Sequence, residues 1–202
     1  MTGTTLKSTA SLALHQVDIV RGDRRLLAEL TLTLKTPQVL WVEGGNGIGK
    51  TSLLRTCAGL TKPDSGGVEW RQYGQPVSAS MVTGYLSAEP TAKPTLSLIE
   101  DAALWGAQDM LNKVGLSAHL KTRTERLSTG QMKRLALAKL LAANKPIWVL
   151  DEPLAGLDVQ GRSLVADLLC AHVGQGGLAL IASHAPLHLT DTAQQRLKLD
   201  AS

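Results

Sequence analysis

The sequence contains no phenylalanine and only two cysteines in 202 residues, and aromatic side chains make up 3% of it. Its charges are nearly balanced, because 21 Lys and Arg against 17 Asp and Glu leave a net charge of +4. The basic residues do not form a block. Without a basic stripe interleaved with aromatic residues, nothing in the charge pattern supports nucleic-acid binding. Cys57, Cys170 and the five histidines do not have the spacing of metal ligands. Because both cysteines lie in apolar helical surroundings, we expect buried reduced thiols and no disulfide.

Long apolar runs are missing as well. No stretch approaches the roughly 20 apolar residues that a membrane-spanning helix needs. Residues 1–10 are polar and lack the apolar centre of a signal peptide. These absences predict a protein that stays in the compartment where it is made. Its 44% hydrophobic content is ample for a buried core, and its length fits one large domain or two small ones.

The most informative stretch is glycine-rich and covers residues 44–51 (GGNGIGKT), directly after the apolar run Val39–Val42. It matches the phosphate-binding pattern Gly, four residues, Gly-Lys-Ser/Thr, between a strand and a helix. Glycines allow successive backbone N–H groups to point inward around an anion, and the helix adds the positive end of its dipole. Lys50 is then expected to reach the β- and γ-phosphates, and the Thr51 hydroxyl to bind Mg²⁺. The stretch predicts a nucleoside-triphosphate site.

The hydrophobic pattern divides the rest of the chain into alternating strands and helices. An antiparallel opening is predicted from strands at 11–20 and 26–34, with a turn at 21–24. A lobe of helices is predicted from about 96 to 120, where apolar residues recur at helical spacing. The other expected helices cover residues 50–60, 128–143 and 160–172, and the other expected strands lie at 39–42, 68–70, 81–86, 146–150, 178–182 and 196–199.

Two of these strands lead into residues whose side chains can bind a metal or take part in catalysis. The strand at 146–150 leads into Asp151 and Glu152, and the strand at 178–182 leads into His184. The carboxyl ends of core strands in an α/β sheet are where ligands bind. Asp151 is placed to hold Mg²⁺, and Glu152 to orient or activate water. Taken alone, such an acidic pair more often only caps the next helix, and a histidine at a strand end is more often structural.

Three further motifs complete an ordered set. LSTGQ at residues 127–131 opens a helix with a capping serine, AGLD follows at 155–158, and SH at 183–184. With the P-loop and the Asp-Glu pair, in this order, the chain resembles the ATP-binding cassette (ABC) ATPases over about residues 11–199. The resemblance implies an α/β P-loop NTPase fold with a RecA-like core, an antiparallel β subdomain and an inserted helical subdomain. It implies one ABC domain over 1–202, with the core and β subdomain at about 1–89 and 133–202 and the helical subdomain at about 90–132.

The resemblance also assigns roles to residues. It implies a head-to-tail dimer that encloses two ATP molecules, each with Mg²⁺, between its cassettes. Lys50, Glu152 and His184 are the implied catalytic residues, and Thr51 and Asp151 the implied metal ligands. Ser128 and Gly130 are expected to bind the γ-phosphate held by the facing subunit, and Asp158 to connect the two sites. The phosphates are expected to be wrapped in cis by Gly44, Gly45, Asn46, Gly47, Ile48, Gly49, Lys50, Thr51 and Ser52.

Two positions depart from the family pattern. Glu89 stands where members usually carry a glutamine that contacts Mg²⁺ through water and senses the membrane partner. A carboxylate can ligate Mg²⁺ but adds negative charge near the phosphates. Arg21 stands where an aromatic residue usually stacks on adenine, and its guanidinium can stack on a base.

Within the family, residues 42–60, Arg21 and the SHAPL stretch at 183–187 are similar to the ATP-binding subunits of bacterial cytochrome c maturation systems, the haem exporter ATPases. That likeness implies a peripheral protein at the cytoplasmic face of the inner membrane, bound to integral-membrane subunits. Its hydrolysis of ATP is expected to drive release of a haem-loaded periplasmic chaperone. No residue of the ATP site is suited to bind haem directly.

Three alternatives stay open from the sequence. The chain could be the ATPase of another small ABC exporter. It could be a soluble ABC ATPase acting on ribosomes or DNA, although such proteins usually fuse two cassettes or insert coiled coils, and no heptad run is present here. It could also be a nucleotide-binding switch without turnover, which Glu152 argues against.

Overall fold

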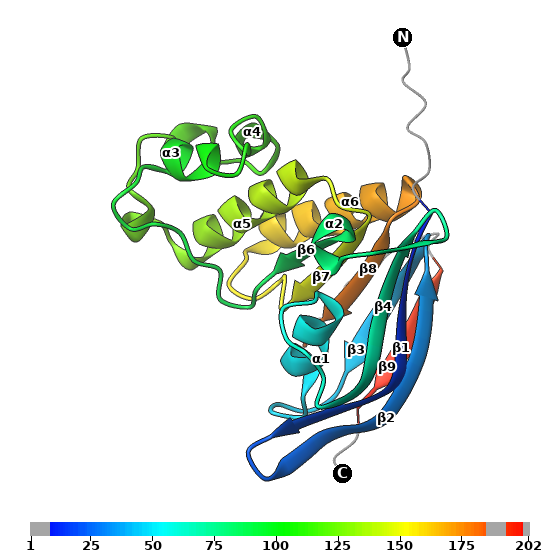
Figure 1. Cartoon of the computed structure of the whole chain (residues 1–202). Helices are drawn as coiled ribbons and strands as arrows, with labels where there is room; N and C mark the ends of the chain where they lie inside the picture. The colour runs from blue at the N-terminus through cyan, green and yellow to red at the C-terminus, as the bar shows by residue number, and fades with distance from the viewer. Residues whose placement is uncertain (1–8, 185–192, 200–202) are drawn as a thin grey trace.

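The computed structural model describes residues 9–184 and 193–199 (Figure 1). The strands are β1 (Ala10–Arg21), β2 (Arg24–Lys35), β3 (Gln38–Glu43), β4 (Ser65–Gln72), β5 (Gln75–Val77), β6 (Thr83–Leu86), β7 (Ile147–Asp151), β8 (Leu178–Ala182) and β9 (Gln194–Lys198). The α-helices are α1 (Lys50–Cys57), α2 (Ala79–Val82), α3 (Leu98–Ala103), α4 (Met110–Lys113), α5 (Thr129–Ala143) and α6 (Val159–Gly174). Short 3₁₀ turns cover Ser117–His119 and Thr124–Arg126.

The strands form two sheets. One is parallel, in the order β6-β7-β8-β3-β9, and the other is antiparallel, in the order β2-β1-β4-β5. In Figure 1 the antiparallel sheet curves along one side of the molecule, and α3 and α4 project from the opposite side. The prediction of an α/β fold with an added antiparallel sheet is confirmed.

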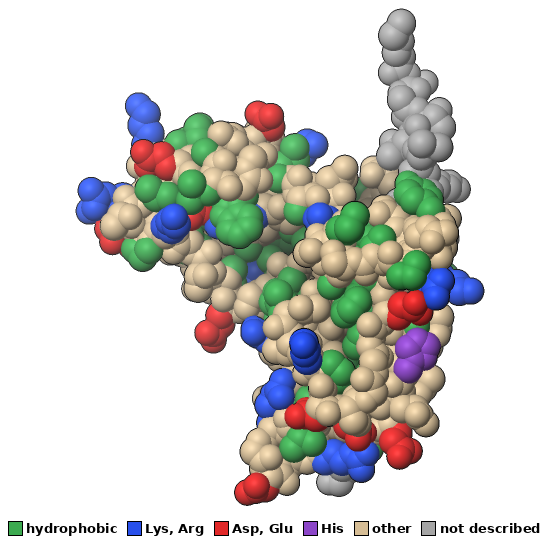
Figure 2. All heavy atoms as spheres, in the orientation of Figure 1, with side chains coloured by type: hydrophobic (Ala, Val, Ile, Leu, Met, Phe, Trp, Pro, Cys, Tyr) green, Lys and Arg blue, Asp and Glu red, His purple; other side chains and the backbone are tan. Residues whose placement is uncertain are grey.

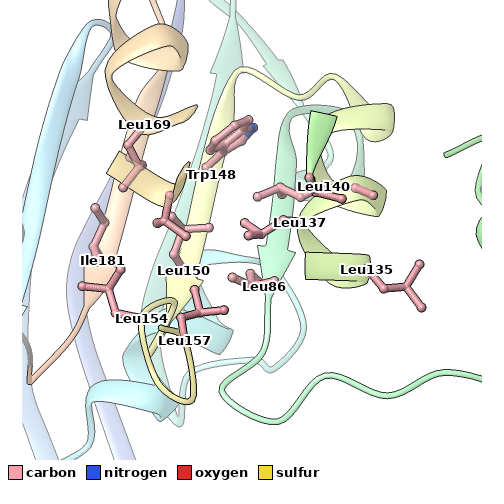
Figure 3. Packing of buried hydrophobic residues seen from close by; sticks show 14 of the residues in the cluster. Leu86, Leu135, Leu137, Leu140, Trp148, Leu150, Leu154, Leu157, Leu169 and Ile181 are labelled. Carbon is pink, nitrogen blue, oxygen red and sulfur yellow. The ribbon is translucent and has the colours of Figure 1, made fainter. Parts of the chain in front are cut away.

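The central strands β7 and β8 of the parallel sheet are buried on both faces, which is why their residues before Asp151 and through Ala182 are continuously apolar. In β7, Ile147 and Val149 point into a core shared with α1 and the antiparallel sheet. Trp148 and Leu150 point the other way, into a core shared with α5 and α6 (Figure 3). Full burial of one such side chain stabilises the fold by about 1.5–3 kcal/mol. These two cores hold the carboxyl ends of the strands in fixed positions.

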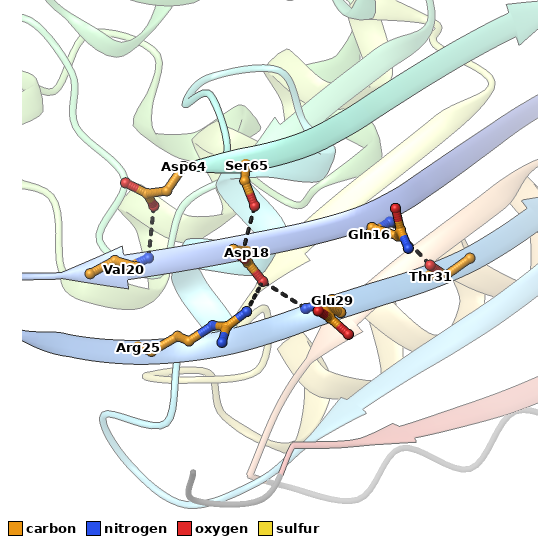
Figure 4. A network of polar contacts seen from close by, with 8 residues as sticks. All are labelled: Gln16, Asp18, Val20, Arg25, Glu29, Thr31, Asp64 and Ser65. Atoms are coloured by element: carbon orange, nitrogen blue, oxygen red, sulfur yellow. Dashed lines mark hydrogen bonds and ion pairs between the residues drawn. The ribbon is translucent and has the colours of Figure 1, made fainter.

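A polar cluster fixes the bend of the antiparallel sheet (Figure 4). Asp18 Oδ1 accepts hydrogen bonds from the Arg25 guanidinium and the Glu29 amide, each at 2.7 Å, and Oδ2 accepts one from Ser65 Oγ at 2.7 Å. These bonds join β1, β2 and β4 where the strand register shifts. They hold the pKa of Asp18 down at about 2, with the Arg25 hydrogen bond as the largest cause. The carboxylate therefore stays charged wherever the protein is near neutral pH.

The inserted segment between β6 and α5 is helical, as predicted, but its helices are shorter than the apolar spacing suggests. Gly106 and Gly115 have φ angles of 63° and 72° and end two of its helical stretches. After α3, the amides of Gly106 and Ala107 bond to the carbonyls of Ala103 and Ala102, at 3.1 and 2.9 Å. This is the pattern of a Schellman C-cap. The spacing of apolar residues does not reveal the effect of these two glycines, which divide the segment into short helices.

The cysteines and α1 refine the sequence predictions. Cys57 is buried, which raises the pKa of its thiol to about 12, whereas Cys170 is only half-buried. Both are free thiols.

Helix α1 stops at Cys57, short of the predicted Leu60, because Gly59 takes a φ of 72° and turns the chain. The predicted boundaries of the helical subdomain, at about residues 90 and 132, stay a prediction. Among the described residues, no helix is both long and apolar enough to cross a bilayer.

Candidate active site

The site lies where three neighbouring parallel strands end. In the sheet order β7, β8 and β3 are adjacent, and Asp151, Ala182 and Val42 are aligned in register. The residues that follow these strands therefore meet at one edge of the sheet. The sequence places Glu152, His184 and the glycine-rich loop there.

The glycine-rich loop is shaped by backbone angles that favour glycine. Gly47 and Gly49 have φ angles of 71° and 114°, and Gly49 is the N-cap of α1. A Cβ at Gly49 would lie 3.1 Å from Leu26 Cβ, so the loop packs close against β2. The first helical hydrogen bond runs from the Leu53 amide to the Gly49 carbonyl at 2.9 Å. The amides before it have no carbonyl one helical turn back and are suited to bind an anion.

Lys50 begins α1 and turns back along the loop. Its ammonium donates to the Gly44 carbonyl at 2.7 Å and to the Gly45 carbonyl at 2.8 Å. The positive charge is thus placed beside the N-terminus of α1, where the helix dipole also favours an anion. The loop combines a lysine, backbone amides and a dipole in the arrangement that phosphate groups require.

A pocket of about 420 Å³ brings most of the predicted residues together. Loop residues, both carboxylates and the histidine share it, although they come from three separate strands. It is lined by Leu26, Asn46, Gly47, Gly49, Lys50, Thr51, Ser52, Ala88, Asp151, Glu152 and His184.

Asp151 is buried at this edge of the sheet, where β7 ends. It is the last residue of β7, its exposed fraction is 2%, and its Oδ2 lies 3.4 Å from the Tyr85 hydroxyl, which donates to it. Burial, and then the charge of Asp151, raise the pKa of Tyr85 to about 12, so the phenol remains a donor at all ordinary pH values. Tyr85 therefore helps to orient the carboxylate.

Glu152 has an unusual backbone for a glutamate, with φ of 46°. Its Oε2 accepts a hydrogen bond from the His184 amide at 3.3 Å, and its Oε1 lies 3.5 Å from His184 Nε2. Oε1 is buried and accepts no hydrogen bond from any described residue. A buried carboxylate oxygen normally has a donor. This oxygen is suited to accept one from a water molecule in the pocket.

Ser128, Gly130 and Asp158 lie elsewhere, around a second pocket of about 570 Å³ that shares no lining residue with the first. Ser128 is the N-cap of α5 and forms a capping box with Gln131. The backbone amide of Gln131 donates to Ser128 Oγ at 3.2 Å. A Cβ at Gly130 would lie 3.1 Å from the Gly156 carbonyl, so the loop before α6 packs tightly on the start of α5. The predicted serine cap is confirmed.

Five predicted residues are not part of either pocket's lining. Glu89 and Arg21 are both exposed. The Arg21 guanidinium donates to the carbonyl of its neighbour Val20 at 2.9 Å. Gly44 and Gly45 contribute their carbonyls to Lys50. Ile48 also lies outside the pockets, because its side chain is buried in the core.

Three residues at the site were not indicated by sequence motifs. Leu26 and Ala88 line the first pocket, and Lys133 contacts the Glu152 carbonyl from beneath. Nothing in the spacing distinguishes Leu26 or Ala88 from core residues. Lys133 did carry a signal, because it is a lysine on the apolar face of the helix that Ser128 opens.

The metal prediction fits the donors at this edge. Within residues 9–184 and 193–199, no group of three or more His, Cys, Asp or Glu side chains could hold a metal. Mg²⁺ in nucleotide sites is usually bound by one or two protein ligands together with phosphate oxygens and water. The Thr51 hydroxyl and the Asp151 carboxylate share the pocket with the loop and meet that requirement.

A comparison with protein-family models gives a match to the ABC transporter family over residues 27–155. That span includes the loop, Ser128 and both carboxylates. The chain belongs to the ABC transporter family. It is an ABC-type ATPase, as its motif order predicted.

The relatives of this cassette include bacterial proteins named cytochrome c biogenesis ATP-binding export protein CcmA. The protein from Methylococcus capsulatus is 43% identical over 194 residues, covering 89% of this chain and 94% of the relative. Those from Rhodopseudomonas palustris and Idiomarina loihiensis are each 36% identical, covering 88% and 98% of this chain and 93% and 97% of theirs.

Solved cassettes have the same fold. An ATP-binding protein of an ABC transporter from Pyrococcus furiosus superposes with a TM-score of 0.74 at 25% identity, covering 93% of this chain and 97% of its own. A cassette solved as a dimer in a post-hydrolysis state, bound to ADP and phosphate, gives a TM-score of 0.76 at 21% identity, covering 86% and 88%. The predicted ABC fold is confirmed.

Proposed function

We propose that this ATPase is the ATP-hydrolysing subunit of a membrane complex for cytochrome c biogenesis, attached to the cytoplasmic face of the bacterial inner membrane. The observation that supports hydrolysis is the meeting of Lys50, Asp151, Glu152 and His184 around one pocket. The name of these relatives, which refers to cytochrome c biogenesis, supports the pathway.

Within this pocket the residues divide the work. Lys50 and the amides of the loop and α1 bind the phosphates of ATP. Thr51 and Asp151 hold Mg²⁺, which neutralises phosphate charge and fixes the orientation of the terminal phosphate when bound. Glu152 accepts a proton or hydrogen bond from the attacking water through its unsatisfied Oε1. His184 sits against that carboxylate and supplies a donor toward the terminal phosphate.

The second pocket supports a head-to-tail dimer. Ser128 and Gly130 stand at the N-terminus of α5, a 15-residue helix, and line a hollow that contains no P-loop residue. A phosphate brought by a facing cassette would meet the first-turn amides and the positive dipole end of that N-terminus. Positioning and charge stabilisation supply most of the catalysis in phosphoryl transfer, so completing the site from a partner gates hydrolysis.

A third hollow is suited to a membrane subunit. A pocket of about 380 Å³ runs between β6, the 87–91 loop, α5 and the inserted helical segment, and its lining is mainly apolar. Trp105 is 63% exposed there, and Lys139 Nζ lies 5.4 Å from the centre of its ring. Figure 2 shows hydrophobic side chains exposed over the helical segment and along the hollow beside it. We propose that the integral-membrane partner docks on this surface.

The experiment that tests the pathway is a gentle-detergent pull-down of the tagged full chain carrying Glu152→Gln, with Mg-ATP. Mass spectrometry is expected to identify membrane subunits of cytochrome c maturation, together with a haem-carrying chaperone. Trp105→Ala should lower their recovery, whereas Tyr73→Ala, an exposed aromatic outside the hollow, should not. Recovery of an unrelated permease would retain the ATPase and refute the pathway; recovery of ribosomes or DNA would refute membrane attachment.

A further inference from the structure

The ammonium of Lys133 is enclosed inside the molecule. Lys133 lies on α5, one turn beyond Ser128, and its exposed fraction is 1%. Its Nζ donates to three backbone carbonyls: Ala88 at 2.6 Å, Glu152 at 3.1 Å and Ser87 at 3.2 Å. A lysine has three donors, so all three are used. Burial lowers the pKa of Lys133, and the charges of Asp151, Glu152 and Glu89 oppose that shift.

These acceptors belong to different parts of the site. The Ser87 and Ala88 carbonyls lie in the loop that leads from β6 toward the helical segment, and Ala88 lines the nucleotide pocket. The Glu152 carbonyl belongs to the residue placed against the attacking water. Lys133 itself is on the helix whose first turn lines the second pocket. One charged group therefore joins three functional elements.

The contact with Glu152 matters because of its backbone conformation. A non-glycine residue in the left-handed region is strained and persists only where its surroundings fix it. The Glu152 amide donates to the Ala182 carbonyl at 2.8 Å, and its carbonyl accepts from Lys133 at 3.1 Å. Both backbone polar groups of this residue are thus held, the amide by β8 and the carbonyl by Lys133 together with the Ala155 amide. Without Lys133 the carbonyl would keep only the local hydrogen bond from the Ala155 amide, at 3.2 Å, and would lose its link to α5.

We infer that Lys133 is a positioning residue for hydrolysis: it fixes the Glu152 backbone, and with it the carboxylate, relative to α5 and the 87–88 loop. A shift of α5 or of that loop moves the ammonium, and the ammonium moves Glu152. The lysine therefore links the proposed docking surface and the second pocket to the water-positioning carboxylate. This inference rests on the proposed role of Glu152 in hydrolysis.

The test compares Lys133→Met with Lys145→Met. Methionine keeps the length and apolar stem of lysine but removes the donors. Lys145 follows the same helix, and its Nζ also donates to a backbone carbonyl, that of Met81 at 3.2 Å, but it lines none of the three pockets described. Lys133→Met is expected to lower kcat at least tenfold while the Kd for a fluorescent ATP analogue changes less than twofold. Lys145→Met is expected to leave both within twofold of the wild-type values.

Two kinetic results would overturn the inference. One is a kcat within twofold of wild type in Lys133→Met. The other is a parallel loss of nucleotide binding, kcat and melting temperature, which would show a merely structural lysine.

Hydrogen exchange provides a measurement that does not depend on turnover. Lys133→Met should speed exchange in peptides spanning residues 86–90 and 151–155, while the peptide of β8 keeps its protection and Lys145→Met matches wild type. Unchanged exchange at both places would refute the inference even if the wild-type chain showed no ATPase activity. Absence of ATPase activity in the wild-type chain would refute the proposed function, whereas unchanged exchange would refute the role of Lys133, so the two failures can be told apart.

Discussion

Acid should destabilise this protein through His172, a residue on α6 distant in sequence from the site motifs. The imidazole stacks on the Trp148 ring with a centroid separation of 4.0 Å, and its Nε2 lies 3.2 Å from the Leu178 carbonyl. Burial is the largest cause that lowers the pKa of His172, from 6.5 to about 4. The folded protein therefore keeps this side chain neutral under conditions where the unfolded chain protonates it.

The sign and size follow from linkage. Between pH 6.5 and about 4 the unfolded state binds more protons than the folded state, so stability rises with pH in that window. The contribution is fully present above pH 6.5 and is lost as the pH falls toward 4. For a single group with these two pKa values, the free energy of unfolding drops by about 2 kcal/mol between pH 7 and pH 5. For a domain of this size that corresponds to roughly 4–8 °C in melting temperature.

The assay is thermal and urea unfolding from pH 7 to pH 4.5, comparing wild type with His172→Gln. The variant is less stable at pH 7, because it loses the stack, but its stability should fall less steeply below pH 6.5. Groups common to both proteins cancel in this difference, including the remaining histidines. Equal slopes for the two proteins would refute the reasoning.

Three further outcomes are expected. Lys50→Ala should weaken nucleotide binding or the transition state by about 1.5–3 kcal/mol, the value of a charge-assisted hydrogen bond, as isothermal titration and ATPase assays would measure; Lys62→Ala, exposed in a turn, is the control, and normal activity in Lys50→Ala would refute the P-loop assignment. Ser128→Ala should lose about 1 kcal/mol of stability with its cap and should slow hydrolysis while the monomer still binds nucleotide, whereas equal loss of binding and hydrolysis would argue against a role across the interface. Asp18→Asn should lower the melting temperature near neutral pH and flatten the loss of stability between pH 3.8 and about 2, and an unchanged acid profile would contradict the bonds around that carboxylate.

The sequence predicted the parts of the fold that depend on local pattern. Alternation at Leu30–Leu34 and the apolar run Val39–Val42 identified strands, and Ser128 identified the start of α5. The lengths of the helices in the inserted segment were not predictable from periodicity, because Gly106 and Gly115 end them through backbone angles. Sheet order was also beyond a local reading, since β8 lies between β3 and β7 although it follows both in sequence.

The candidate site shows the same division. The glycine-rich loop and the Asp151-Glu152 pair were found because each follows a strand in a recognisable pattern. The predicted positions of Glu89 and Arg21 rested on likeness to other cassettes, and here both side chains are exposed and line neither pocket. Lys133 stood out only as a lysine on the apolar face of α5, and its contacts were missed because its partners are backbone carbonyls from two distant segments.

The central claim is that Glu152 positions water for hydrolysis at a site built by this chain. The most direct measurement is single-turnover hydrolysis of Mg-ATP by Glu152→Gln and wild type, with light scattering on the same samples. Glu69→Gln, which changes a half-buried β4 glutamate paired with Arg71, is the control. The account predicts that Glu152→Gln binds ATP normally, hydrolyses it roughly 10²–10⁴-fold more slowly and accumulates as an ATP-bound dimer. Hydrolysis at the wild-type rate in Glu152→Gln would contradict it.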